Sequence, residues 1–168
     1  MTIELVSTAP ENLAASAPPA VHPLIERLCA QTAAPILDAA SFDAWAAAPG
    51  RALVVFTEDP ALYRETLDLA VIVPELAQAL RQGDAQPFRV GVLLQAAART
   101  VATRYGFRRW PALVVLADGQ YVGAIDGLRD WQDYLDELAR LLATAPTRAP
   151  SIGIAVKTAG ADDGRHCH

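Results

Sequence analysis

The most constraining stretch of the sequence is PALVVLADGQYVGAI, residues 111–125, in which two apolar runs flank Asp118-Gly119. Each run has the length and the composition of a strand. Asp-Gly is typical of the two-residue turns that join antiparallel strands. The stretch therefore predicts a β-hairpin.

Further strands are predicted ahead of the hairpin, at 52–56 (ALVVF) and 88–94 (FRVGVLL). Uninterrupted apolar runs of this length are typical of central strands that are buried on both faces. A shorter strand is predicted at 35–37. With helices between the strands, this order predicts a three-layer α/β sandwich whose mixed sheet is closed by the antiparallel hairpin and a last helix. Other small α/β folds share the same order.

Helices are predicted where apolar residues recur every three or four positions. Ser41 and Asp130 are the expected N-caps of the second and the last helix, because short polar side chains accept hydrogen bonds from a first turn. Gly106 is expected to follow the end of the fourth helix. Trp131 and Tyr134 fall on the apolar stripe of the last helix and are predicted to be core residues. The predicted helices span 22–32, 41–48, about 61–82, 96–105 and 130–142.

The two ends of the chain differ in composition from the middle. Residues 1–20 are rich in Ala, Ser and Pro and are predicted to be disordered; residues 145–168 are rich in Pro and Gly and are predicted to be a flexible tail. A single domain is expected over 21–144, and the apolar content, slightly over half of all residues, suffices for a core.

Charge and cysteine content limit the classes of function. A net charge of −5 argues against binding to nucleic acid or to an anionic membrane surface. No run of residues is long and apolar enough to insert into a membrane, and the N-terminus lacks the pattern of a secretion signal. The two cysteines lie far apart in the sequence and predict no disulfide framework, so a reduced cytoplasmic protein is expected.

The run YGFRRWP, residues 105–111, resembles the segment that precedes the cis-proline strand of thioredoxins. The resemblance implies a thioredoxin-like α/β fold with a cis peptide bond between Trp110 and Pro111. It also implies that the main chain before the proline lies at a sheet end, where members of this fold pair with extended client peptides.

The thiol chemistry of thioredoxins is missing from the sequence. The resemblance places the two redox positions at Ala61 and Arg64, and it places the buried Asp and Lys that handle protons for the thiols at Val55 and Val92. A buried charge with no thiol to serve only costs free energy, so apolar replacements are expected. The sequence predicts a thioredoxin-like scaffold without disulfide chemistry.

A narrower family resembles the chain over roughly residues 35–142. Asp59-Pro60, LDLAVIVPEL (67–76) and FRRWPALVVLADGQYVGAIDGLRDWQDYL (107–135) are similar to hydrogenase expression proteins of the HyaE/HupG type. The resemblance implies a non-enzymatic maturation chaperone for nickel–iron hydrogenase that needs no cofactor. Its expected partners are the small-subunit precursor and the twin-arginine signal peptide of that precursor, with other hydrogenase maturation proteins as further candidates.

An excess of acidic residues between positions 57 and 80 fits a cationic client. A solvated helix face is the equally weighted alternative. Trp110 has no helix stripe to join, which favours contact with a peptide. The opposite charge gathers at Arg99, Arg104, Arg108 and Arg109, with no acid among them. The predicted partner-binding residues are Trp110, Pro111, Glu58, Asp59, Pro60, Tyr63, Glu65 and Asp68.

Competing functions rest on the cysteines and histidines. Cys29 is expected to be an inert, at least half-buried thiol, and the alternative is a one-cysteine thiol oxidoreductase. A general peptide-binding adaptor is a third possibility. The ending His166-Cys167-His168 packs three ligand types into consecutive residues, which makes a poor closed metal site, so no physiological metal is predicted.

Overall fold

The computed structural model describes residues 20–150. The segment predicted to be disordered, 1–20, lies outside the described residues except for Ala20. The tail beyond residue 150, with its His-Cys-His ending, lies outside them as well.

The order of helices and strands is the predicted one. Four helices alternate with the strands up to the final hairpin, and a fifth helix follows it. The elements are α1 (Pro23–Thr32), β1 (Ile36–Leu37), α2 (Ala39–Ala46), β2 (Arg51–Phe56), α3 (Glu65–Gln82), β3 (Phe88–Leu93), α4 (Gln95–Ala102), β4 (Ala112–Ala117), β5 (Gln120–Asp126) and α5 (Trp131–Ala143).

One mixed sheet forms the middle of the domain, with strand order β1-β3-β2-β4-β5. β1, β3 and β2 are parallel, whereas β4 is antiparallel to β2 and β5 is antiparallel to β4. Because β2 and β3 are central, every residue of β2 after Arg51 is buried, as the apolar runs predict.

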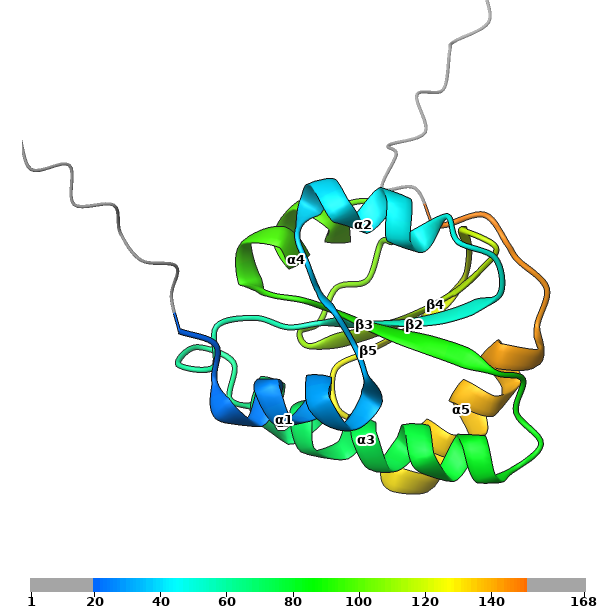
Figure 1. Cartoon of the computed structure of the whole chain (residues 1–168), viewed down its shortest axis with the longest axis horizontal. Coiled ribbons are helices and arrows are strands. Elements are labelled where there is room, and N and C mark those ends of the chain that lie inside the picture. Colours follow the sequence, from blue (N-terminus) through cyan, green and yellow to red (C-terminus); the bar gives the residue numbers. More distant parts are fainter. Residues whose placement is uncertain (1–19, 151–168) are drawn as a thin grey trace, which may run out of the picture.

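Helices cover both faces of the sheet, with α1, α3 and α5 on one face and α2 and α4 on the other (Figure 1). Alternate residues of a strand point to opposite faces, so one strand serves two cores. In β2, Leu53 and Val55 join the core beneath α1, α3 and α5. Val54 and Phe56 join the core beneath α2 and α4.

The hairpin turns at Asp118-Gly119 as predicted. Both residues have positive φ, 51° and 77°, the backbone that a tight two-residue turn with matching twist requires. The Asp118 carboxylate also accepts a hydrogen bond of 2.8 Å from the main-chain N–H of Gly50, which ties the turn to the start of β2.

Three predicted helix details are wrong. Asp38, not Ser41, is the N-cap of α2; Ser41 is the third residue of the helix, and the two side chains cap each other's main chain. α4 ends at Ala102, so Gly106, at φ 67°, turns the loop beyond it rather than the helix end. Trp131 is 45% exposed, because it is the first residue of α5 and lies beyond the edge of the core.

Two other features of α5 agree with the predictions from the sequence. Tyr134 is buried as predicted, and its hydroxyl donates a hydrogen bond to the Gly127 carbonyl. Asp130 occupies the N-cap position, although its side chain makes no capping hydrogen bond.

The chain beyond α5 stays against the domain at least to residue 150. Thr147 donates from its main-chain N–H to the Tyr121 carbonyl at 2.7 Å and from its hydroxyl to the Val122 carbonyl at 3.2 Å. The segment therefore lies along β5, which is otherwise an edge strand. Contact with the domain does not end at residue 144, where the sequence predicts the start of a flexible tail.

Candidate functional site

The candidate site lies at the sheet end where the parallel strands finish. β1 ends at Leu37, β2 at Phe56 and β3 at Leu93, and the chain leaves all three toward the same side. Ligands of open α/β sheets bind outside the carboxyl ends of such strands. β4 begins at this end, because Ala112 pairs with Phe56.

The loop 57–64 leads from β2 into α3 and contains Ala61 and Arg64, which the sequence analysis assigns to the redox positions of thioredoxins. It is held by its own groups: Asp59 accepts hydrogen bonds from the N–H of Ala61 through its carboxylate and from those of Leu62 and Tyr63 through its carbonyl. Val55 and Val92 are paired, fully buried neighbours beneath the loop. No charged side chain takes the place of the proton-handling pair of thioredoxins at these two positions.

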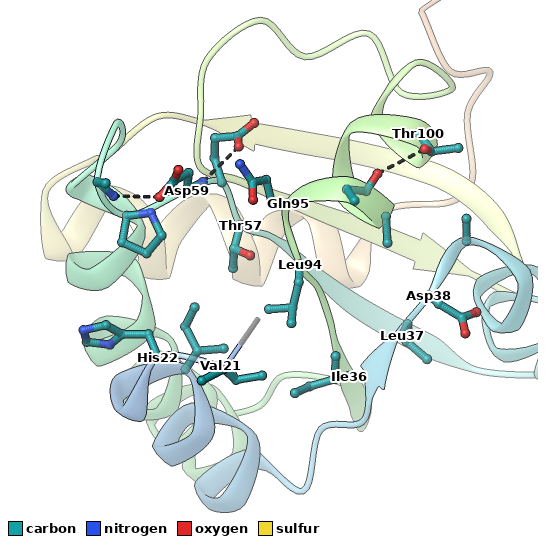
Figure 2. Close-up of a pocket in the computed structure, with 18 of the residues that line it drawn as sticks. Val21, His22, Ile36, Leu37, Asp38, Thr57, Asp59, Leu94, Gln95 and Thr100 are labelled. Atoms are coloured by element: carbon teal, nitrogen blue, oxygen red, sulfur yellow. Dashed lines mark hydrogen bonds between the residues drawn. The ribbon is translucent and has the colours of Figure 1, made fainter. Parts of the chain in front are cut away.

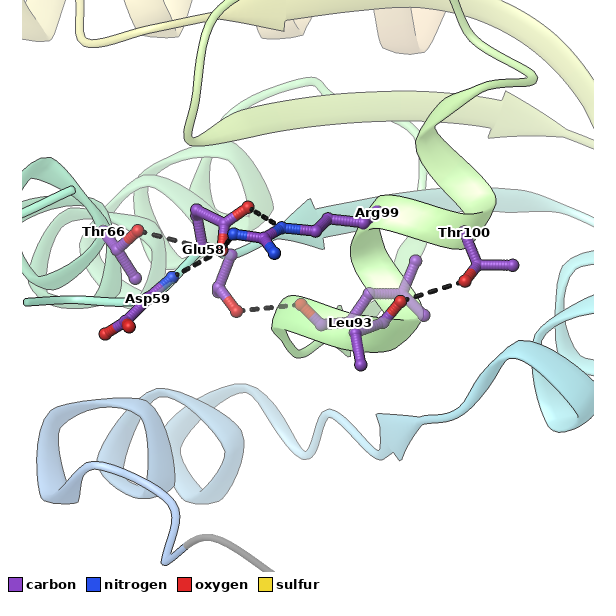
Figure 3. A network of polar contacts seen from close by, with 8 residues as sticks. Glu58, Asp59, Thr66, Leu93, Arg99 and Thr100 are labelled. Carbon is purple, nitrogen blue, oxygen red and sulfur yellow. Dashed lines mark hydrogen bonds and ion pairs between the residues drawn. The ribbon is translucent and has the colours of Figure 1, made fainter. Parts of the chain in front are cut away.

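Glu58 is buried at the start of this loop, and both its carboxylate and its main-chain N–H are hydrogen-bonded within the domain (Figure 3). Its carboxylate accepts two hydrogen bonds from Arg99, at 2.6 and 2.8 Å, and one from the Asp59 N–H at 2.9 Å. Its own N–H donates to the Thr66 hydroxyl. The hydrogen bonds that Arg99 donates to Glu58 raise the pKa of the Arg99 guanidinium. The pair fastens α4 to the loop, so Glu58 has no free charge to offer a client.

A second charged feature also differs from its prediction. Arg99 and Arg104 are not part of a free basic patch, because Arg99 pairs with Glu58 and Arg104 pairs with Asp43 of α2. The acids that neutralise them are distant in the sequence and close in the fold. Arg108 and Arg109 are the members of the patch that stay exposed without an ion pair among the described residues.

Phe107, Trp110 and Pro111 form an aromatic ledge in front of β4. The peptide bond between Trp110 and Pro111 is cis, and Pro111 is buried while Trp110 is half-buried. The Trp110 ring packs edge-on against Phe107 at 5.1 Å, and Phe107 packs in the same way on Phe56. No hydrogen bond joins the main chain of Trp110 to another described residue.

The remaining predicted contact residues are exposed. Tyr63 lies at the end of the loop, and Glu65 and Asp68 lie in the first turn of α3. Beside Tyr63 the structure exposes Leu62, at 70%, which sequence analysis did not single out. An exposed leucine within a charged loop carries no periodic signal, because loops have no apolar stripe.

One cavity lies away from the aromatic ledge. A pocket of about 1130 Å³, named here the β1 pocket, opens on the other side of the loop 57–64 (Figure 2). Of the predicted contact residues, Glu58, Asp59 and Pro60 line it, whereas Trp110, Pro111, Tyr63, Glu65 and Asp68 do not. Its walls are residues 20–23 and 36–39, residues 57–61, residues 94–97, Ile25 and Thr100.

The sequence analysis did not predict this pocket, although the position of three of its four walls could have been predicted. Three of its walls directly follow β1, β2 and β3, and the rule that ligands bind beyond carboxyl ends would have found them. The fourth wall, Val21 to Ile25, depends on how α1 packs against α3, which no local pattern reports.

Cys29 lies on α1, half-buried against the core between α1 and α3. Burial raises the pKa of its thiol, and the nearby charge of Glu26 adds to this effect, while a hydrogen bond to the main chain opposes it. A raised pKa keeps the group in the less reactive thiol form.

Within residues 20–150, no three potential ligands from His, Cys, Asp and Glu gather into a metal site. No described helix combines the length and the apolarity that crossing a membrane requires.

Comparison with known proteins agrees with this architecture. Residues 24–134 match the family model described as "Hydrogenase-1 expression protein HyaE". The chain is 42% identical over 151 residues to the hydrogenase expression/formation protein HoxO of Cupriavidus necator, covering 89% of this chain and 90% of that protein. It is 30% identical to HupG of Rhizobium leguminosarum bv. viciae, covering 82% and 88%.

A solved structure supports the fold. A mutant thioredoxin from Halobacterium salinarum superimposes with a TM-score of 0.52 at 24% sequence identity, covering 67% of this chain and 93% of that one. The fold is therefore thioredoxin-like, as the sequence predicts.

Proposed function

The chain belongs to the HyaE family of hydrogenase expression proteins, and on that premise we propose that it is a non-catalytic chaperone that binds the small-subunit precursor of a nickel–iron hydrogenase, or the twin-arginine signal peptide of that precursor. The single observation that carries the proposal is that its relatives over nearly their whole length are hydrogenase expression/formation proteins. A client that still carries its signal peptide is met before export, so we place this step in the cytoplasm.

The aromatic ledge and the neighbouring loop supply a suitable binding face. The unpaired main chain of Trp110 can hydrogen-bond an extended peptide, and Leu62 and Tyr63 offer exposed apolar surface nearby in the same sheet-end region. Asp59, Glu65 and Asp68 add negative charge that favours a cationic client. Pro60 and Pro111 shape the main chain on which these groups stand.

The absence of thiols at the redox positions supports binding without catalysis. Ala61 and Arg64 occupy these positions, and Cys29 is held as a half-buried thiol on a different element. The competing proposal of a one-cysteine oxidoreductase predicts disulfide-reducing turnover that disappears in Cys29→Ala. We expect no turnover from the wild-type protein and full client binding by Cys29→Ala.

Co-purification from cells that express the small-subunit precursor tests the proposal. We expect recovery of the precursor with its signal peptide and weaker recovery after its deletion. Trp110→Ala should reduce recovery, whereas Trp131→Ala, which removes an exposed tryptophan of α5 that is not among the predicted contact residues, should not.

Two outcomes would contradict the proposal. Failure to recover the precursor, or any hydrogenase maturation protein, would contradict the assignment to hydrogenase maturation. Equal recovery of unrelated precursors would instead indicate a general peptide-binding adaptor.

A further inference from the structure

We propose that the β1 pocket binds the apolar segment of a client peptide whose flanking residues are basic. The inference rests on the proposed function, since it names where the apolar part of such a client lies. It adds a second binding region, because the pocket shares no lining residue with the aromatic ledge.

The walls of the pocket are suited to apolar burial. Ile36 is 45% exposed on the pocket side of β1, and Val21 and Leu94 are only half-buried (Figure 2). At about 1130 Å³ the pocket is slightly larger than the ~300–1,000 Å³ typical of ligand sites, so it has room for several apolar side chains.

Three polar side chains of the pocket, those of Thr57, Thr100 and His22, are already engaged inside the domain. The Thr57 hydroxyl donates to the Leu93 carbonyl at 2.9 Å, and the Thr100 hydroxyl donates to the Ala96 carbonyl at 3.0 Å. His22 accepts a hydrogen bond from the Leu24 N–H through Nδ1. A ligand is therefore selected by apolar surface and net charge more than by these donors.

The charge of the pocket is negative. Asp38, Glu58 and Asp59 line it, and no Lys or Arg does. Arg99 neutralises Glu58, whereas Asp38 and Asp59 have no ion pair within residues 20–150. Hydrogen bonds from the Ser41 main chain and hydroxyl lower the pKa of Asp38, so it stays ionised. Two uncompensated carboxylates beside apolar walls fit an apolar segment with basic neighbours.

The edge of the sheet favours a peptide over a compact small molecule. β1 is the outermost strand of the described sheet and is only two residues long, so one side of it pairs with no other described strand. An extended peptide can lie along such an edge while its side chains enter the neighbouring pocket.

Fluorescence anisotropy with a labelled synthetic peptide tests the inference on the full chain. The probe carries two arginines ahead of about ten leucine and alanine residues, the length of a signal-peptide apolar region. Ile36→Asp should raise the Kd at least about tenfold, because the pocket loses apolar surface. Val71→Asp is the matched control, since Val71 is 47% exposed on α3 and does not line the pocket; it should leave the Kd unchanged.

Two further arms address volume and charge. Ala96→Trp, at an exposed alanine of α4 that lines the pocket, should weaken binding by filling the space without adding charge. A probe with two glutamates in place of the arginines should bind at least about tenfold more weakly, and Asp38→Asn with Asp59→Asn should narrow that difference while preserving the capping acceptors.

The inference is wrong if Ile36→Asp and Ala96→Trp bind the probe as well as Val71→Asp does, or if the glutamate probe binds equally well. Co-purification separates this failure from failure of the proposed function. If Ile36→Asp and Ala96→Trp recover as much precursor as the wild-type protein, the pocket is not the binding site, and the proposed function stands. Absence of precursor with the wild-type protein, together with the expected probe behaviour, rejects the hydrogenase client and retains the pocket as a peptide site.

Discussion

The aromatic ledge and the β1 pocket lie at the same end of the sheet, on either side of the loop 57–64, and they are built in opposite ways. At the ledge the domain fills the space with its own rings: Phe56, Phe107 and Trp110 form an edge-on series with centroids 5.1 Å apart at each step. At the pocket, Ile36 and small alanines leave the space open. The two regions could therefore play different parts in the proposed function. The ledge provides main-chain groups for hydrogen bonds, and the β1 pocket provides space for apolar side chains.

The most severe test of this contrast is the removal of the ring beneath the ledge. Phe56→Ala should lower the free energy of unfolding by about 3–5 kcal/mol, because the side chain is fully buried against Tyr105 and Phe107. Ile36→Ala should cost less than about 1 kcal/mol, since the pocket leaves this residue half-exposed. Urea denaturation measures both, and equal losses would show that the pocket wall is packed like the ledge.

Trp110 itself should have an intermediate effect. Trp110→Ala should lower the free energy of unfolding by about 1–3 kcal/mol, below the cost of a fully buried aromatic, because the ring is only half-buried at the edge of the core beneath α2 and α4. The control Trp131→Ala should change it by no more than about 0.5 kcal/mol. A Trp110→Ala variant as stable as this control would mean that Trp110 is not part of the packed ledge.

The loop between the two regions depends on its buried ion pair. Glu58→Gln should destabilise the domain by about 1–2 kcal/mol, less than loss of a fully buried pair because Arg99 is half-exposed. Asp43→Asn, which breaks the exposed pair with Arg104, is the matched comparison and should have little effect. Thermal melting of the two variants distinguishes them, and a larger loss for Asp43→Asn would contradict the structural role assigned to Glu58.

The smallest effect is expected at Cys29, which lies outside both regions. Because burial raises its pKa and only the thiolate reacts, alkylation at any given pH should be slower than for a free thiol, and its midpoint should shift to higher pH. Iodoacetamide labelling of a Cys167→Ser variant, monitored by mass spectrometry, isolates this thiol. A midpoint below that of free cysteine would indicate an activated thiol and would revive the oxidoreductase alternative.

The features of the fold and the site that were predictable are those encoded by short stretches of the sequence. The hairpin at Asp118-Gly119 and the apolar pair Val55 and Val92 follow from turn chemistry and from uninterrupted apolar runs. Glu58 is a different case, because its acidic character is visible in the sequence while its partner lies 41 residues away. The sequence suggested a free charge, and the fold neutralises it.

Patterns also failed where a residue stood at the end of an element. Trp131 belongs to the apolar stripe of α5 by spacing, yet at the first helical position it lies beyond the core edge and stays exposed. Ser41 has the chemistry of an N-cap, but Asp38 precedes it by three residues and takes that position, so the two share a capping box. Periodicity reports which face a residue occupies and does not report where the core stops.

The sequence by itself determined the order of helices and strands, the tight turn of the hairpin and the lack of thiols at the redox positions, because each depends on residues that are close along the chain. Only the tertiary structure decided that Arg99 would bind Glu58, that Thr147 would lie along β5 and that α1 would leave an open pocket beside β1. These features arise where surfaces from distant segments meet, and burial and charge pairing there depend on shape and distance rather than on local order.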